Sequence, residues 1–149
     1  MLLRWVLAAL HLVALGLGAG SIANRARTLS APLDAGGFKR LFMADTIWGV
    51  AALLWISTGL WRLLGQTEKS TAYYLGNGVF WTKMGFLLAI MVLEIWPMMT
   101  LIRWRMQVAR GEPVDTSRAP ALARISRVQL LLVIAMVFAA TAMARGMGS

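Results

Sequence analysis

Long runs of apolar residues dominate this chain, and polar positions are confined to the stretches between them. A hydrocarbon core of about 30 Å takes about 20 helical residues to cross. Four runs meet that length, at residues 2–23, 42–64, 79–101 and 128–144. Because every backbone polar group in lipid must be satisfied within its own segment, we predict an all-α integral membrane four-helix bundle. It forms a single domain over residues 1–149.

The composition supports a membrane protein, since 59% of the 149 residues are hydrophobic and only 14% are charged. The connections between the runs are too short for a separate soluble domain. Any chemistry is therefore expected inside the bundle or at its rims. The chain has no cysteine, which excludes disulfides, thiol catalysis and thiolate metal ligands.

The net charge of +9 is distributed unevenly between the two ends of the predicted bundle. Cytoplasmic loops carry an excess of Lys and Arg, so the basic end is predicted to be inside and both termini on the outer, periplasmic side. The basic loops lack interleaved aromatic residues, which argues against nucleic acid and leaves membrane lipid as the expected partner. The residues assigned to the basic end are Arg25, Arg27, Lys39, Arg40, Arg103, Arg105, Arg110, Arg118, Arg124 and Arg127.

The first apolar run has an alternative interpretation as a cleavable signal peptide. Arg4 would be its charged start, and the small residues at 18–23 would lie near the cleavage site. Cleavage would place the next connection outside, against the charge distribution, and would remove His11.

Small residues in the first run predict close helix contacts. Gly16 and Gly20 have GxxxG spacing, with Gly18 between them. Such glycines let two helix backbones approach in lipid. The pattern is typical of a tight bundle and equally of a homodimer.

The basic connections are predicted to be ordered. Asp34, Lys39 and Arg40 would form a short amphipathic helix on the membrane surface. The third apolar helix should continue to about Val108, and Pro120 fits the first turn of the helix that leads into the fourth run.

Away from the ends of the apolar runs there are four ionisable residues: His11, Asp45, Lys83 and Glu94. With about 1.5 Å of rise per residue, His11 and Lys83 lie in the outer half of the membrane, and Asp45 and Glu94 in the inner half. Lys83 and Glu94 share one face of the third helix, so both should point into the bundle. A charge at mid-membrane costs about 2.5–3.5 kcal/mol, and such residues usually pair or line a cavity.

These residues support two kinds of function. In a ligand-binding protein, His11 is the candidate metal ligand, able to hold the iron of a haem b, and Lys83 would bind a propionate or another small anionic group. Lys83, Glu94 and Asp45 are also candidate catalytic or proton-relay groups. A second iron ligand would have to come from the methionines at positions 84, 136 or 143.

In the alternative, the protein is a non-enzymatic structural or transport-associated subunit whose polar residues fix helix packing. Lys83 would then snorkel outward, and Glu94 would pair with Arg103 or Arg105. Trp55 falls near mid-membrane, where its indole N–H needs an acceptor that the sequence does not identify. Whether the protein is an enzyme is left open by these patterns.

Three stretches, LRWVLAALHL at 3–12, ADTIWG at 44–49 and FWTKMGFLLAIMVLEIWPMMTLIRWR at 80–105, resemble a family of predicted bacterial membrane proteins, domain of unknown function 2214. This resemblance implies a four-helix protein of the bacterial cytoplasmic (inner) membrane. The pairing of His11 in the first helix with Lys83 in a later one is similar to the HemJ-type protoporphyrinogen oxidases and the CopD-like membrane proteins. That weaker resemblance implies haem binding through His11 and Lys83.

Overall fold

The computed structural model describes residues 1–66 and 69–148, which form five α-helices and contain no strand. Four helices are long and apolar enough to cross a membrane, and each contains one of the predicted spans. The prediction of an all-α protein with four membrane helices is therefore confirmed. The helices are α1 (Leu2–Leu29), α2 (Ala35–Leu64), α3 (Thr71–Leu75), α4 (Gly78–Ala109) and α5 (Ala119–Ala144).

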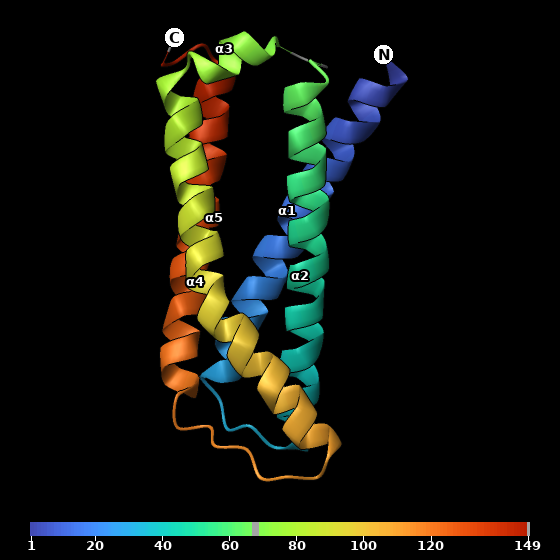
Figure 1. Cartoon of the computed structure of the whole chain (residues 1–149), viewed down its shortest axis with the longest axis vertical. Coiled ribbons are helices and arrows are strands. Elements are labelled where there is room, and N and C mark those ends of the chain that lie inside the picture. Colours follow the sequence, from blue (N-terminus) through green and yellow to red (C-terminus); the bar gives the residue numbers. More distant parts are fainter. Residues whose placement is uncertain (67–68, 149) are drawn as a thin grey trace.

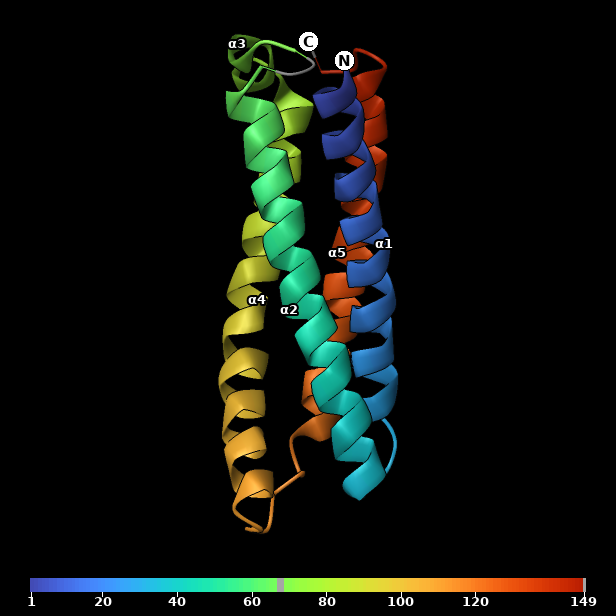
Figure 2. The ribbon, with the colours of Figure 1, turned by 90° about the vertical axis from the view of Figure 1, so that its right-hand side faces the viewer.

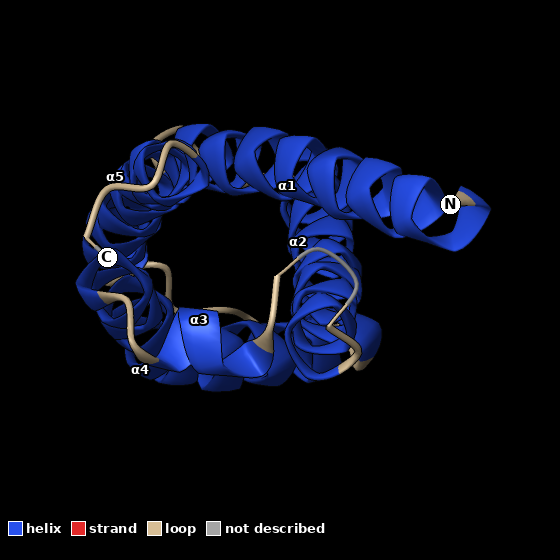
Figure 3. Cartoon of the chain, turned by 90° about the horizontal axis from the view of Figure 1, so that it is seen from above, coloured by secondary structure: helices blue, strands red, loops and turns tan. Residues whose placement is uncertain are grey.

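The four long helices run up and down alongside one another (Figures 1 and 2), and from above they are arranged in a ring (Figure 3). In order around the ring, α2 packs against α1, α1 against α5, and α5 against α4, whereas α2 and α4 lack a comparable contact. Viewed from above, α3 lies at one end of the ring, between α2 and α4 (Figure 3). Both termini lie at that same end (Figure 1). We call it the outer end, after the charge-based prediction, and the opposite end the inner end.

The basic connections are shorter than predicted because the helices extend into them. Asp34 caps α2, since its Oδ1 accepts a hydrogen bond of 2.7 Å from the Gly37 N–H. From there α2 continues without a break, so the predicted separate helix on the membrane surface is wrong. The other two predictions hold: α4 continues to Ala109, past Val108, and Pro120 lies in the first turn of α5.

The inner half of the bundle is closed by a packed core. Leu41, Leu101 and Leu122 are fully buried there, and Phe38 meets Trp104 edge to face at 6.1 Å between ring centroids. In this half α4 bends toward α2 (Figure 1). Pro97 lies inside α4, and a proline removes a backbone hydrogen bond and kinks a helix. At the inner end, side chains of α4 reach α2: Arg105 donates to the Phe42 carbonyl, and Trp104 meets Phe38. The outer halves of these helices lie apart (Figure 1).

Gly18, rather than the GxxxG pair, is the glycine at which α1 meets α2. A Cβ added at Gly18 would lie 3.7 Å from both the Ala51 Cβ and the Trp48 ring. A Cβ at Gly16 or Gly20 would meet nothing within 4 Å. The predicted role of Gly16 and Gly20 in packing within the bundle is therefore wrong, and their role in a homodimer stays a prediction.

The contact at Gly18 predicts a difference between two glycines of the same helix. Gly18→Leu should push α1 away from α2 and cost about 1–3 kcal/mol, the usual range for overpacking. Gly16→Leu is the matched control and should leave stability nearly unchanged. Thermal unfolding in detergent measures both variants, and equal melting temperatures would contradict the proposed contact.

Candidate functional site

Arg25 lies at the centre of a polar cluster in the inner half of the bundle. Its side chain is 0% exposed, and its partners come from all three of the other long helices. Nη1 donates to Asp45 Oδ1 at 3.0 Å and to Glu94 Oε1 at 2.8 Å. Nη2 donates to Glu94 Oε2 at 2.9 Å and to Gln129 Oε1 at 2.7 Å, and Nε donates to Ser126 Oγ at 3.0 Å. All five donors of the guanidinium are thereby used.

The carboxylates of this cluster are shared with further donors. Gln129 Nε2 donates to Glu94 Oε2 at 2.8 Å, and Arg105 Nη2 donates to Asp45 Oδ2 at 3.2 Å. Arg105 also donates to the Phe42 carbonyl at 2.8 Å. Two arginines therefore face two carboxylates, and the cluster is formally neutral, which is the condition under which buried charges are tolerated.

Sequence reasoning placed Arg25 among the basic loop residues, and this was wrong. The charge ends the apolar run at residue 23, but α1 continues to Leu29 and carries Arg25 into the bundle. The suggested pairing of Glu94 with Arg103 or Arg105 is also wrong, because Glu94 is held by Arg25 and it is Asp45 that contacts Arg105. One feature of the sequence could have identified Arg25 as a buried residue. Asp45 and Glu94 lie within the predicted spans, and no cation was predicted at their depth to neutralise them.

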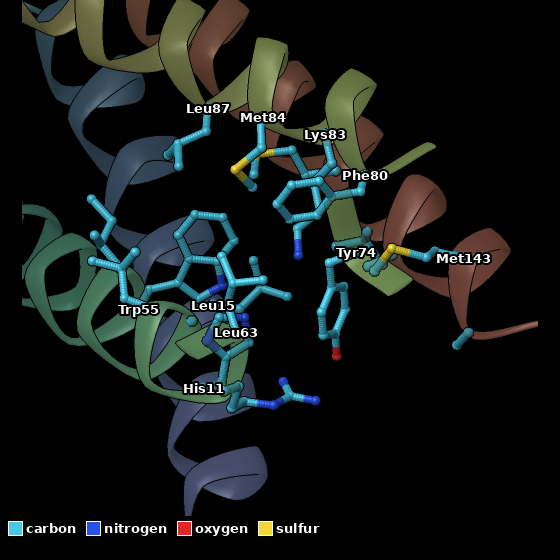
Figure 4. A pocket seen from close by; sticks show the side chains of 18 of the residues that line it. His11, Leu15, Trp55, Leu63, Tyr74, Phe80, Lys83, Met84, Leu87 and Met143 are labelled. Atoms are coloured by element: carbon cyan, nitrogen blue, oxygen red, sulfur yellow. The ribbon is translucent and has the colours of Figure 1, made fainter. Parts of the chain in front are cut away.

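The outer half of the bundle contains a cavity of about 540 Å³, which we call the outer cavity. His11 and Lys83 both line it, as the depth estimate predicted. In Figure 4, His11 and Trp55 lie on one side, Lys83 and Met84 lie opposite, and the Lys83 amine extends into the space between them. Its volume is in the range of about 300–1,000 Å³ that is usual for small-molecule sites.

His11 is fixed in the cavity wall by α2. Its Nδ1 lies 2.8 Å from Thr58 Oγ1, and its ring stacks on Trp55 with 5.2 Å between centroids. The Thr58 hydroxyl also lies 2.8 Å from the Leu54 carbonyl, which ties its position to the α2 backbone. Gly59 permits this approach, because a Cβ there would lie 3.3 Å from His11 Cε1.

The polar groups around the outer cavity are mainly cationic. Besides Lys83, its described lining includes Arg62 and Lys69 and contains no carboxylate. Lys69 Nζ lies 4.0 Å from the centre of the Tyr73 ring, and the Tyr73 hydroxyl donates to the Met143 carbonyl at 3.3 Å. The rest of the lining is largely apolar. An apolar chamber with cations toward its outer end suits a ligand that combines an apolar body with an anionic group.

The three methionines considered as iron ligands, Met84, Met136 and Met143, all line the same cavity as His11. The described residues contain no group of three or more His, Cys, Asp or Glu side chains that could hold a metal ion.

The fold and these two polar layers define a multi-pass membrane protein with an internal cavity. The sequence model of the family DUF2214, described as predicted membrane protein, matches residues 3–148, so the chain belongs to this family. No curated protein and no solved structure matches it. The family resemblance predicted from sequence is confirmed, whereas the HemJ-type resemblance stays a prediction.

We expect Arg25, Asp45 and Glu94 to stabilise the fold only when all three are present, because each neutralises or is neutralised by the others. Arg25→Leu should cost about 3–5 kcal/mol, because it leaves two carboxylates without their shared cation. Adding Asp45→Asn and Glu94→Gln should restore much of that loss. Arg27→Leu, an exposed arginine on the same helix, is the control.

The free energy of unfolding in detergent or bilayer measures these variants. If Arg25→Leu destabilised the protein no more than Arg27→Leu, or if the triple variant recovered nothing, the cluster would not hold the helices as described.

Proposed function

We propose that the protein binds an amphiphilic anion in the outer cavity. The observation that carries this proposal is the set of cations, Lys83, Arg62 and Lys69, around an otherwise largely apolar chamber. Cations retained within membrane helices usually mark a ligand or ion pathway. The apolar walls would cover the body of the ligand, and the cations would bind its anionic group.

We further propose that the protein lies in the bacterial cytoplasmic membrane with both termini outside. The excess of basic residues at the inner end supports this orientation. The outer cavity would then lie in the outer half of the bilayer. An anionic ligand would enter it from the periplasm or from the outer leaflet.

Haem b is the particular ligand that the sequence suggests, and the cavity supports it in two respects. Thr58 Oγ1 lies 2.8 Å from His11 Nδ1, and this contact orients the imidazole as hydrogen bonds to iron-ligating histidines do. Lys83 lies across the cavity, where it could bind a propionate (Figure 4). A bound haem would supply electron-transfer chemistry.

The alternative function, in which buried polar residues fix helix packing, is favoured for the inner polar layer, which is the cluster around Arg25. Asp45 and Glu94 are held by Arg25 in a satisfied, neutral cluster, which suits a structural role. Their assignment as catalytic or relay groups, together with Lys83, stays a prediction. A structural inner layer and a binding outer layer are compatible in one bundle.

The proposal predicts that binding depends on the Lys83 charge. Decyl phosphate should bind the detergent-purified protein more tightly than decanol. Lys83→Met should weaken the binding of decyl phosphate by about tenfold and leave the binding of decanol unchanged. Native mass spectrometry measures the bound fraction. Lys39→Met, an exposed inner-end lysine, is the control. Equal binding of the phosphate and the alcohol would argue against an anion site.

The haem interpretation has a separate test. Protein purified from haem-supplemented cells should show a Soret absorption band that His11→Ala removes, because the iron loses its protein ligand. Lys83→Met should lower the haem content without removing the histidine ligand. A colourless preparation that still binds decyl phosphate would exclude haem and leave the amphiphile site intact.

A further inference from the structure

A second cavity of about 650 Å³ lies next to the outer one and extends toward the inner end. We call it the inner groove. Its walls come mainly from α1, α2 and α4 and are apolar, with Asp45, Thr46 and Glu94 among the few polar residues. The groove lies where α2 and α4 do not pack against each other. Several of its apolar residues, among them Val50, Leu53, Met91 and Ile95, are exposed on the surface that would face the bilayer.

The two cavities meet at a shared wall. Leu15, Trp55, Ile56 and Leu87 line both of them. The indole N–H of Trp55 is buried and has no hydrogen-bond partner among the described residues. A buried donor without an acceptor is unfavourable, so the junction suits a ligand that brings an oxygen to this point.

The dimensions of the combined site match one leaflet of a membrane. Lys83 lines the outer cavity and Glu94 the inner groove, and the eleven residue steps from one to the other along α4 correspond to about 16 Å of helix. Half of a hydrocarbon core is about 15 Å. A lipid in the outer leaflet likewise holds its phosphate outward and its chain inward, and here the groove continues past the midplane to Asp45 and Glu94.

From this arrangement we infer that the outer cavity and the inner groove form one site for a lipid-like alkyl phosphate. The phosphate lies among the cations of the outer cavity, and the alkyl chain lies in the inner groove between α2 and α4. The ligand enters sideways from the bilayer through the opening between these helices. This inference rests on the proposed function and narrows its ligand to a chain-bearing anion.

Gly49 offers a direct way to fill the groove. It lines the groove, and a Cβ added there would meet nothing within 4 Å. Leucine is also a better helix former than glycine, so Gly49→Leu should fold. Gly85→Leu is the matched control, because Gly85 has equal space and lines neither cavity.

The experiment compares hexadecyl phosphate with decyl phosphate by native mass spectrometry of the full chain. Wild type should prefer the longer chain, because additional methylene groups are buried in the groove. Gly49→Leu should weaken the binding of hexadecyl phosphate by about tenfold and change the binding of decyl phosphate little, since the shorter chain leaves most of the groove empty. Gly85→Leu should change the binding of neither compound. Ala52→Leu, one turn further along α2 and also in the groove, repeats the test if Gly49→Leu does not fold.

Each other outcome has a distinct meaning. If decyl phosphate binds but Gly49→Leu and Ala52→Leu leave the chain-length preference unchanged, the inference is wrong and the proposed function stands. If neither phosphate binds wild type, the proposed function itself fails. If Gly49→Leu converts a dimer into a monomer, the groove is covered by a second copy of the chain, which also overturns the inference.

Discussion

The arrangement of the four long helices depends on the buried guanidinium of Arg25, which needs a hydrogen-bond partner for each of its donors. Arg25 is inaccessible to solvent, and its five donors are satisfied only when side chains from α2, α4 and α5 converge on it. In lipid the hydrophobic effect does not distinguish one helix arrangement from another, so packing and polar contacts decide. A cluster with partners on every long helix fixes rotation and register at one depth.

The position of this cluster explains the contrast between the two halves of the molecule. Below and around it, the bend in α4 and the contacts of Arg105 and Trp104 bring α4 onto α2 and close the inner end. Above it lies the outer cavity, with α2 residues such as Trp55 on one side and α4 residues such as Lys83 on the other. The packed core therefore lies at the inner end, and the outer cavity lies in the other half.

The two polar layers therefore differ in character. In the inner layer each charge has an opposite charge or a fixed hydrogen-bond partner, which suits a structural element. In the outer layer the described ionisable lining, His11, Arg62, Lys69 and Lys83, is basic and surrounds a chamber rather than a packed core. An excess of one charge sign around a cavity is the arrangement expected of a binding site.

The sequence alone determined the class of protein, the four membrane helices and the depths of His11, Asp45, Lys83 and Glu94, because length, hydropathy and helical rise are local properties. Only the tertiary structure decided that Arg25 belongs inside, that Gly18 rather than Gly16 and Gly20 is the contact, and that α2 and α4 leave a groove open. Hydropathy ends a span at the first charge and cannot tell that partners from distant helices will neutralise it. Which sides of the helices meet depends on contacts between residues far apart in the chain.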